Sequence, residues 1–330
     1  MSRIKKSATT ALFLLAFISA GLTASGASEN NDGLTVITTT SIITDVVKNI
    51  AGDHITVKGL IPQGGNPHNY QPTPREMAMV EKADLLLVSG LGLEEALLDS
   101  LKNVSKGKVV EVSSRIEPLA FEEEGEHHDL EDHDDEADHD EGDDHHHDQD
   151  PHTWTSLLNV LTWTEVISDA LSELDPANRT AYQANAENYR KKLLDLDSRA
   201  REILSAIDEK DRKLVSDHSL FGYFARDYGF EDFGALVPSF STNGEVSAKD
   251  FSRLIEEVNE YQIKAVFIGN TAGDSIKKLG AVLVEESDHP VELLTIMTGS
   301  LAAPGETGDT YLGYFEYNVN QIAKGLRSEN

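Results

Sequence analysis

The sequence contains no cysteine among its 330 residues. This absence excludes disulfide bonds, thiolate metal sites and a lipid anchor carried on an N-terminal cysteine. Basic residues are also scarce, because 28 Lys and Arg stand against 58 Asp and Glu, which gives a formal net charge of −30. Such a charge repels the phosphates of nucleic acid, so nucleic acid is excluded as a partner.

Long apolar runs are lacking outside the first thirty residues. There, Arg3, Lys5 and Lys6 precede the run ALFLLAFISAGLTA, and the small residues of ASGAS follow it. This order is typical of a secretory signal peptide, and the run is shorter than the ~20 residues that a spanning helix needs. We therefore predict a signal peptide at residues 1–27 and a soluble periplasmic protein, monomeric and not a lipoprotein.

The acidic residues concentrate in one segment. Residues 122–150 hold seventeen Asp and Glu and seven His, with no Lys or Arg; removing those seventeen charges from −30 leaves −13. Low hydrophobicity and high charge cannot offset the entropy of folding, so we predict a disordered insertion. Its histidines should capture divalent cations weakly, unless the segment is only a solvated charge run. These histidines are His127, His128, His133, His139, His145, His146 and His147.

Outside this insertion, short β-rich runs alternate with helical ones over residues 33–175 and again over 212–330. That alternation predicts an α/β protein with two lobes of parallel βαβ units. Between the lobes, residues 176–208 form a helical pattern that would be roughly 50 Å long. Asp175 is a plausible cap for this helix, with Pro176 at its first position. We predict a rigid linking helix.

Five histidines lie outside the insertion: His54, His68, His152, His218 and His289. In open parallel sheets, ligands bind beyond the carboxyl ends of the strands. His68 lies in a loop that leaves a predicted strand, His218 directly follows another, and His152 precedes a predicted helix. Three imidazoles from such positions could meet at one metal ion in the crevice between the lobes, and neutral imidazole suits Zn²⁺ and the later first-row metals.

Other roles are open for some of these histidines. His54 and His289 are predicted to be turn residues before strands. His218, taken alone, could start a helix and make a capping bond. A proline precedes both His68 and His152, which restricts the backbone and favours fixed geometry. A site of this kind should lose its metal as the pH falls below about 6.5, where imidazole takes up protons.

Three motifs resemble those of one protein family. GGNPHNYQPTPREMAMVEKADLLLVSGLGLE is similar to the first-ligand motif of the zinc/manganese ABC-transporter solute-binding proteins, the ZnuA-like and TroA-like group. DPHTW and SDHSLFGYFARDYGF resemble the second and third motifs, and the likeness covers nearly all of the chain after the predicted signal. The resemblance implies that His68, His152 and His218 are the metal ligands. It also implies delivery of the metal to a membrane permease.

The chain departs from the family at one position. Many members supply a fourth, acidic ligand from a segment that matches IMTGSLAAPG, where the aligned residue is Gly299. Water, a carboxylate of the insertion or another acid could fill this place. Three imidazoles without an acid favour Zn²⁺ over Mn²⁺. We therefore predict a high-affinity Zn²⁺-binding protein that serves an ABC-type importer; the alternatives are a Mn²⁺-selective member or a freestanding periplasmic zinc buffer or chaperone.

A zinc hydrolase would also use three histidines, with a bound water as the nucleophile. The sequence has no HExxH motif, and no carboxylate is placed as a general base. We predict that the protein is not an enzyme.

Overall fold

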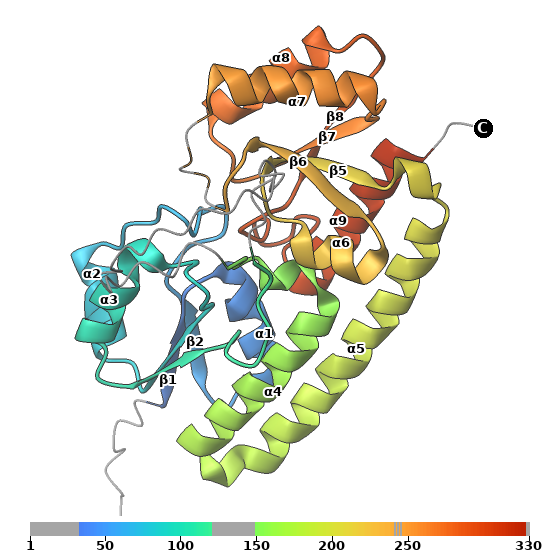
Figure 1. Cartoon of the computed structure of the whole chain (residues 1–330). Coiled ribbons are helices and arrows are strands. Elements are labelled where there is room, and N and C mark those ends of the chain that lie inside the picture. Colours follow the sequence, from blue (N-terminus) through green and yellow to red (C-terminus); the bar gives the residue numbers. More distant parts are fainter. Residues whose placement is uncertain (1–32, 121–148, 241, 243, 245, 328–330) are drawn as a thin grey trace, which may run out of the picture. The chain divides into compact units, whose positions relative to one another are not determined.

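The computed structural model describes residues 33–120, 149–240, 242, 244 and 246–327. The predicted signal peptide and the seven histidines of the insertion lie outside the described residues. Within these ranges, no helix combines the length and the apolar character that crossing a membrane requires. The described residues from Leu34 onward form one unit, which contains two α/β lobes (Figure 1).

The first lobe is built on a four-stranded parallel sheet in the order β2-β1-β3-β4. Its strands are β1 (Thr35–Thr38), β2 (Thr56–Gly59), β3 (Leu85–Val88) and β4 (Lys108–Glu111). Successive side chains point to opposite faces, so Leu85 and Leu87 enter one core while Leu86 and Val88 enter another. The covering helices are α1 (Ser41–Ala51) on one face, and α2 (Pro74–Glu81) and α3 (Glu95–Val104) on the other.

The second lobe repeats this topology, with the strand order β6-β5-β7-β8. Its strands are β5 (Lys213–His218), β6 (Glu231–Val237), β7 (Ala265–Gly269) and β8 (Glu292–Ile296). Its helices are α6 (Gly222–Tyr228), α7 (Ala248–Glu260), α8 (Asp274–Glu286) and α9 (Tyr311–Leu326). Helices α7 and α8 cover one face of the sheet, and α6 and α9 cover the other (Figure 1). The predicted fold class is confirmed.

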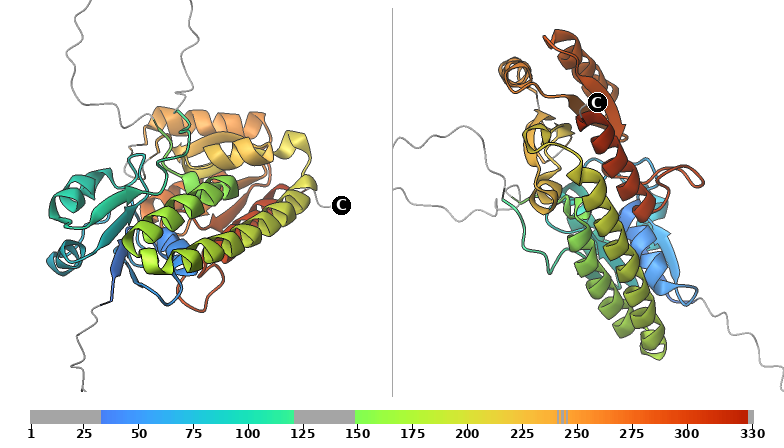
Figure 2. Two further views of the ribbon diagram at one scale, coloured as in Figure 1. Left: turned by 90° about the horizontal axis from the view of Figure 1, so that it is seen from below. Right: turned by 90° about the vertical axis from the view of Figure 1, so that its right-hand side faces the viewer.

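Two long helices connect the lobes. Helix α4 (Leu157–Leu174) is the helix predicted to follow His152, and α5 (Arg179–Ser205) runs antiparallel beside it (Figure 2). Helix α5 contacts α1 of the first lobe and α9 of the second, and the core cluster that it enters draws residues from both sheets. This arrangement makes α5 a shared structural element of the two lobes.

The start of the linking helix differs from the prediction. Pro176–Asn178 forms a 3₁₀ turn, so the α-helix begins at Arg179 and ends at Ser205 rather than Asp208. Asp175 makes no capping bond to the backbone. Its carboxylate instead accepts hydrogen bonds from the side chains of Asn178 and Tyr182, each at 2.7 Å. The side-chain bonds fix the turn between α4 and α5.

A buried carboxylate joins the ends of β1 and β3. Glu94, 1% exposed, accepts hydrogen bonds from the hydroxyl of Thr39 and from the backbone N–H groups of Ser89 at 2.8 Å and Gly90 at 3.4 Å. Burial raises the pKa of the Glu94 carboxyl above 4.5, because the charged form loses its hydration and the hydrogen bonds compensate only in part. Glu94 is therefore a structural group with an unfavourable charge at neutral pH.

Replacing Glu94 with glutamine should remove a pH dependence of stability. The contribution of a carboxyl with a raised pKa is present below its unfolded-state value and is lost as the pH rises through its folded-state value. The unchanged protein should thus lose stability relative to Glu94→Gln between pH 4.5 and neutral pH. Urea denaturation at both pH values measures this difference. A difference that stays constant between the two pH values would contradict the prediction, since the amide does not titrate and only the carboxyl of Glu94 can make the difference depend on pH.

Candidate metal centre

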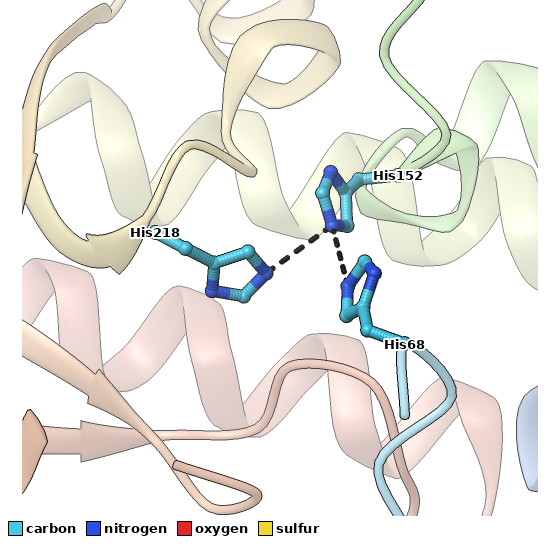
Figure 3. Close-up of side chains that lie close together, drawn as sticks. All are labelled: His68, His152 and His218. Carbon is cyan, nitrogen blue, oxygen red and sulfur yellow. Dashed lines mark hydrogen bonds between the residues drawn. The ribbon is translucent and has the colours of Figure 1, made fainter. Parts of the chain in front are cut away.

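The structure brings His68, His152 and His218 together (Figure 3). The Nε2 atom of His152 lies 3.2 Å from Nε2 of His68 and 3.2 Å from Nε2 of His218. One ligand nitrogen from each ring lies within 4.8 Å of the other two. Tetrahedral zinc with Zn–N bonds of about 2.0–2.1 Å requires nitrogens about 3.3 Å apart. The arrangement of the three rings therefore suits a single ion.

Each histidine reaches this point from a different part of the fold. His218 is the last residue of β5, and His68 lies in the loop between β2 and α2. His152 immediately precedes the 3₁₀ turn Thr153–Thr155, which leads into α4. His218 and His68 thus lie at or beyond the carboxyl ends of parallel strands, where open α/β sheets bind their ligands.

Asp150 fixes the position of His152. Its Oδ1 atom accepts a hydrogen bond from the backbone N–H of His152 and lies next to the ring Nδ1, both at 2.8 Å. The hydroxyl of Tyr223, from the second lobe, donates to the carbonyl of Asp150 at 2.8 Å, and Gln149 forms an antiparallel bridge with Ala120. The predicted insertion extends to residue 150, whereas Gln149 and Asp150 belong to the folded stem beside His152.

Trp154 joins the same segment to the second lobe. Its indole N–H donates to the carbonyl of Thr298 at 2.9 Å, and the hydroxyl of Tyr314 donates to the same carbonyl at 2.6 Å. Thr298 directly precedes Gly299. The sequence indicates Trp154 only as an aromatic neighbour of His152; its bond to residue 298 depends on the packing of distant segments.

The loop that carries His68 is also bonded to the second lobe. Asn66 accepts a hydrogen bond from the backbone N–H of His68 at 3.0 Å, and its amide donates to the hydroxyl of Thr242 at 2.9 Å. The backbone N–H of Gly64 donates to the hydroxyl of Ser300 at 2.7 Å. Bonds to two separate segments of the second lobe thus position this loop.

Gly299 packs directly against the His68 loop. A Cβ atom at Gly299 would lie 2.6 Å from Cδ and 2.9 Å from Cγ of Pro67. Any side chain at this position would therefore displace Pro67 and, with it, His68. Within the described ranges, no carboxylate joins the three histidines in one cluster of potential ligands.

Burial keeps two of the rings neutral. Loss of hydration, followed by the neighbouring imidazoles, lowers the pKa of His68 and of His152 well below 6.5. Neutral imidazole is the form that binds metal. Both rings are therefore ready to coordinate at neutral pH. Protons should compete with the metal at these two residues only at a pH below the 6.5 at which free histidine takes up a proton.

The other two histidines of the folded chain lie outside the cluster. His54 is exposed in the turn before β2, where its ring meets Tyr182 edge-on with 5.8 Å between the ring centroids. His289 precedes β8, and its Nε2 donates to the carbonyl of Ile263 at 2.8 Å. Both are turn residues, as their sequence context predicts.

Two α/β lobes and a cluster of three histidines drawn from separate parts of the fold are the arrangement expected of a metal-binding protein. Over residues 36–325 the chain matches the family described as ZnuA, "Zinc-uptake complex component A periplasmic", and it belongs to that family. The chain is accordingly a metal ABC transporter substrate-binding protein and not an enzyme.

Two of the relatives that the chain matches along nearly its whole length have names that state manganese. The chain is 32% identical over 318 residues to the manganese-binding lipoprotein MntA of Halalkalibacterium halodurans, covering 96% of each chain. It is 29% identical to the manganese ABC transporter substrate-binding lipoprotein PsaA of Streptococcus anginosus, covering 98% of this chain and 99% of the relative.

Among solved structures, the periplasmic zinc binding protein TroA of Treponema pallidum matches with a TM-score of 0.77 and 26% identity, covering 90% of this chain and all 100% of TroA. The Mn-bound periplasmic metal binding protein of Candidatus Liberibacter asiaticus matches with a TM-score of 0.74 and 27% identity, covering 89% and 99%. Both zinc and manganese therefore occur among the stated ligands of proteins with this fold.

Proposed function

We propose that this protein captures Zn²⁺ with His68, His152 and His218 and delivers it to the membrane permease of an ABC importer. The 3.2 Å separations between Nε2 of His152 and the Nε2 atoms of the other two rings support this proposal most directly. Zinc accepts three imidazoles in tetrahedral geometry, with water or a carboxylate as the fourth ligand. Gly299 offers no side chain for that fourth place.

Manganese is the second candidate. The names of MntA and PsaA and the Mn-bound structure from Candidatus Liberibacter asiaticus favour it. Manganese(II) prefers oxygen ligands and sits low in the stability order for nitrogen-containing sites. The cluster in this chain consists of nitrogen donors within the described residues, so we place zinc first.

We also propose that the protein is exported by the signal peptide at residues 1–27 and is soluble and monomeric in the periplasm. Several relatives are named lipoproteins. The present sequence has no cysteine on which a lipid could be placed. In this respect the chain would resemble TroA, whose name is that of a periplasmic protein.

Removing residues 121–148 should abolish several weak metal equivalents and leave one tight one. The deletion spares Asp150, because this residue holds His152 in place. Calorimetric titration with zinc measures both classes of site. The same deletion combined with His152→Ala is the control, and it should show no tight equivalent. Loss of the tight equivalent on deletion of residues 121–148 alone would assign it to the insertion and contradict the proposal.

Delivery to an importer requires a separate test. Cells that lack this protein should take up less zinc at low external zinc, and His152→Ala should not restore uptake. Normal uptake without the protein would favour a freestanding zinc buffer.

A further inference from the structure

We propose that Asp150 and Asp217 are positioning residues that act through the Nδ1 atoms of His152 and His218. Their carboxylates hold the two rings with Nε2 directed at the ion, and their negative charges balance the charge of the ion. This inference rests on the proposed metal-binding function and names residues beyond the three ligands.

Asp150 already holds its histidine. The residue is 1% exposed, and its Oδ1 atom lies 2.8 Å from Nδ1 of His152. A carboxylate accepts the proton on Nδ1, which leaves the lone pair of Nε2 available to a metal. The second oxygen, Oδ2, is buried and has no hydrogen-bond partner within the described chain. A negative charge on this carboxylate would therefore be buried, and a nearby cation would balance it.

Asp217 stands in the same relation to His218, at a longer distance. Both residues are almost fully buried, and Oδ1 of Asp217 lies 3.4 Å from Nδ1 of His218. Neither atom makes a hydrogen bond to any described residue. Two buried polar atoms that lack other partners therefore face each other behind the site.

Glycine provides the space for each carboxylate. A Cβ atom at Gly222 would lie 2.8 Å from Oδ2 of Asp150, and one at Gly269 would lie 2.9 Å from Oδ2 of Asp217. Separations this short are not tolerated between real atoms, so a larger residue at Gly222 would displace the carboxylate of Asp150, and one at Gly269 would crowd both Thr298 and the carboxylate of Asp217. The two carboxylates are thus accommodated in the same way, in different parts of the fold.

The two carboxylates would supply the negative charge that the three histidine ligands lack. Three neutral imidazoles bring no negative charge to a divalent ion, and a buried charge is costly unless it is paired. Asp150 and Asp217 together bring two negative charges, each one imidazole ring away from the Nε2 cluster. The ion and the two carboxylates would therefore stabilise one another.

Asparagine at these positions isolates the role of charge, because it keeps an oxygen acceptor for Nδ1 and removes the negative charge. Asp150→Asn and Asp217→Asn should each weaken zinc binding by about 10- to 100-fold, the range for outer partners of ligating histidines. The double variant should lose more than either single one. The control is Asp45→Asn, since Asp45 accepts a hydrogen bond from the backbone N–H of Tyr311 at 3.0 Å, away from the histidines. Its zinc affinity should not change.

A spectroscopic measurement separates positioning from general loss of structure. The visible absorption of bound Co²⁺ reports the coordination geometry. Asp150→Ala removes the hydrogen-bond acceptor as well as the charge, so it should alter this absorption. The circular dichroism of the metal-free variant should match that of the unchanged protein. Zinc affinities of the asparagine variants equal to that of the unchanged protein would overturn the inference. If Asp150→Asn does not fold, Asp217→Asn decides. Tight zinc binding by His152→Ala would instead refute the proposed function itself.

Discussion

Replacing His152 with alanine should weaken zinc binding by more than about 100-fold, because even the outer partners of a metal-binding histidine contribute about 10- to 100-fold. His152 is the central member of the cluster, since its Nε2 lies 3.2 Å from that of both other rings. Its removal leaves two donors on opposite lobes with no ring between them. Competition titration against a chromophoric chelator, in the protein that lacks residues 121–148, measures the loss.

The matched controls are the two histidines outside the cluster. His54 is exposed and His289 bonds to the carbonyl of Ile263, so His54→Ala and His289→Ala should bind zinc as tightly as the unchanged protein. His68→Ala and His218→Ala should show losses comparable to that of His152→Ala. Equal affinities of His152→Ala and His54→Ala would show that the tight site lies elsewhere.

Zinc should bind far more tightly than manganese to the protein without residues 121–148. The cluster offers nitrogen donors, which zinc accepts without a geometric penalty from its filled d-shell, whereas manganese prefers oxygen. Competition titrations with the two metals measure the preference. Copper can outcompete zinc in such an experiment, because it stands higher in the stability order, so copper must be absent. Manganese binding as tight as zinc binding would overturn the assignment and favour the second candidate.

Substitution of Gly299 also tests the preference for zinc over manganese, because an aspartate at this position would supply the acidic ligand that the chain lacks there. From the sequence, Gly299→Asp is expected to raise manganese affinity if residue 299 faces the crevice. The structure adds a steric cost, because a Cβ atom would lie 2.6 Å from Cδ of Pro67. Gly299→Ala and Gly299→Asp should therefore both weaken zinc binding by moving the His68 loop. A gain in manganese affinity for the aspartate variant alone would show that the loop yields and that the acid reaches the ion.

Much of the fold follows from local sequence pattern. Each buried strand appears as a short apolar run. Helix α4 follows His152 as predicted, because its hydrophobic period and its Ser156 cap are properties of neighbouring residues. The positions of His68 and His218 after strands are local in the same sense. Local pattern was therefore enough to predict the α/β class, the two lobes and the three candidate ligands.

Contacts between distant segments were decided by the tertiary structure alone. The two sheets share one strand order, which the alternation of short runs does not specify, and Gly64 bonds to Ser300 across 236 residues. Asp217 and His218 are adjacent in sequence, but their burial at the end of β5 depends on the packing of the whole protein. These features depend on which surfaces lie together after folding. Burial changes the free energy of a charged carboxylate or imidazole more than the neighbouring residues in the chain do, so it cannot be predicted from local sequence.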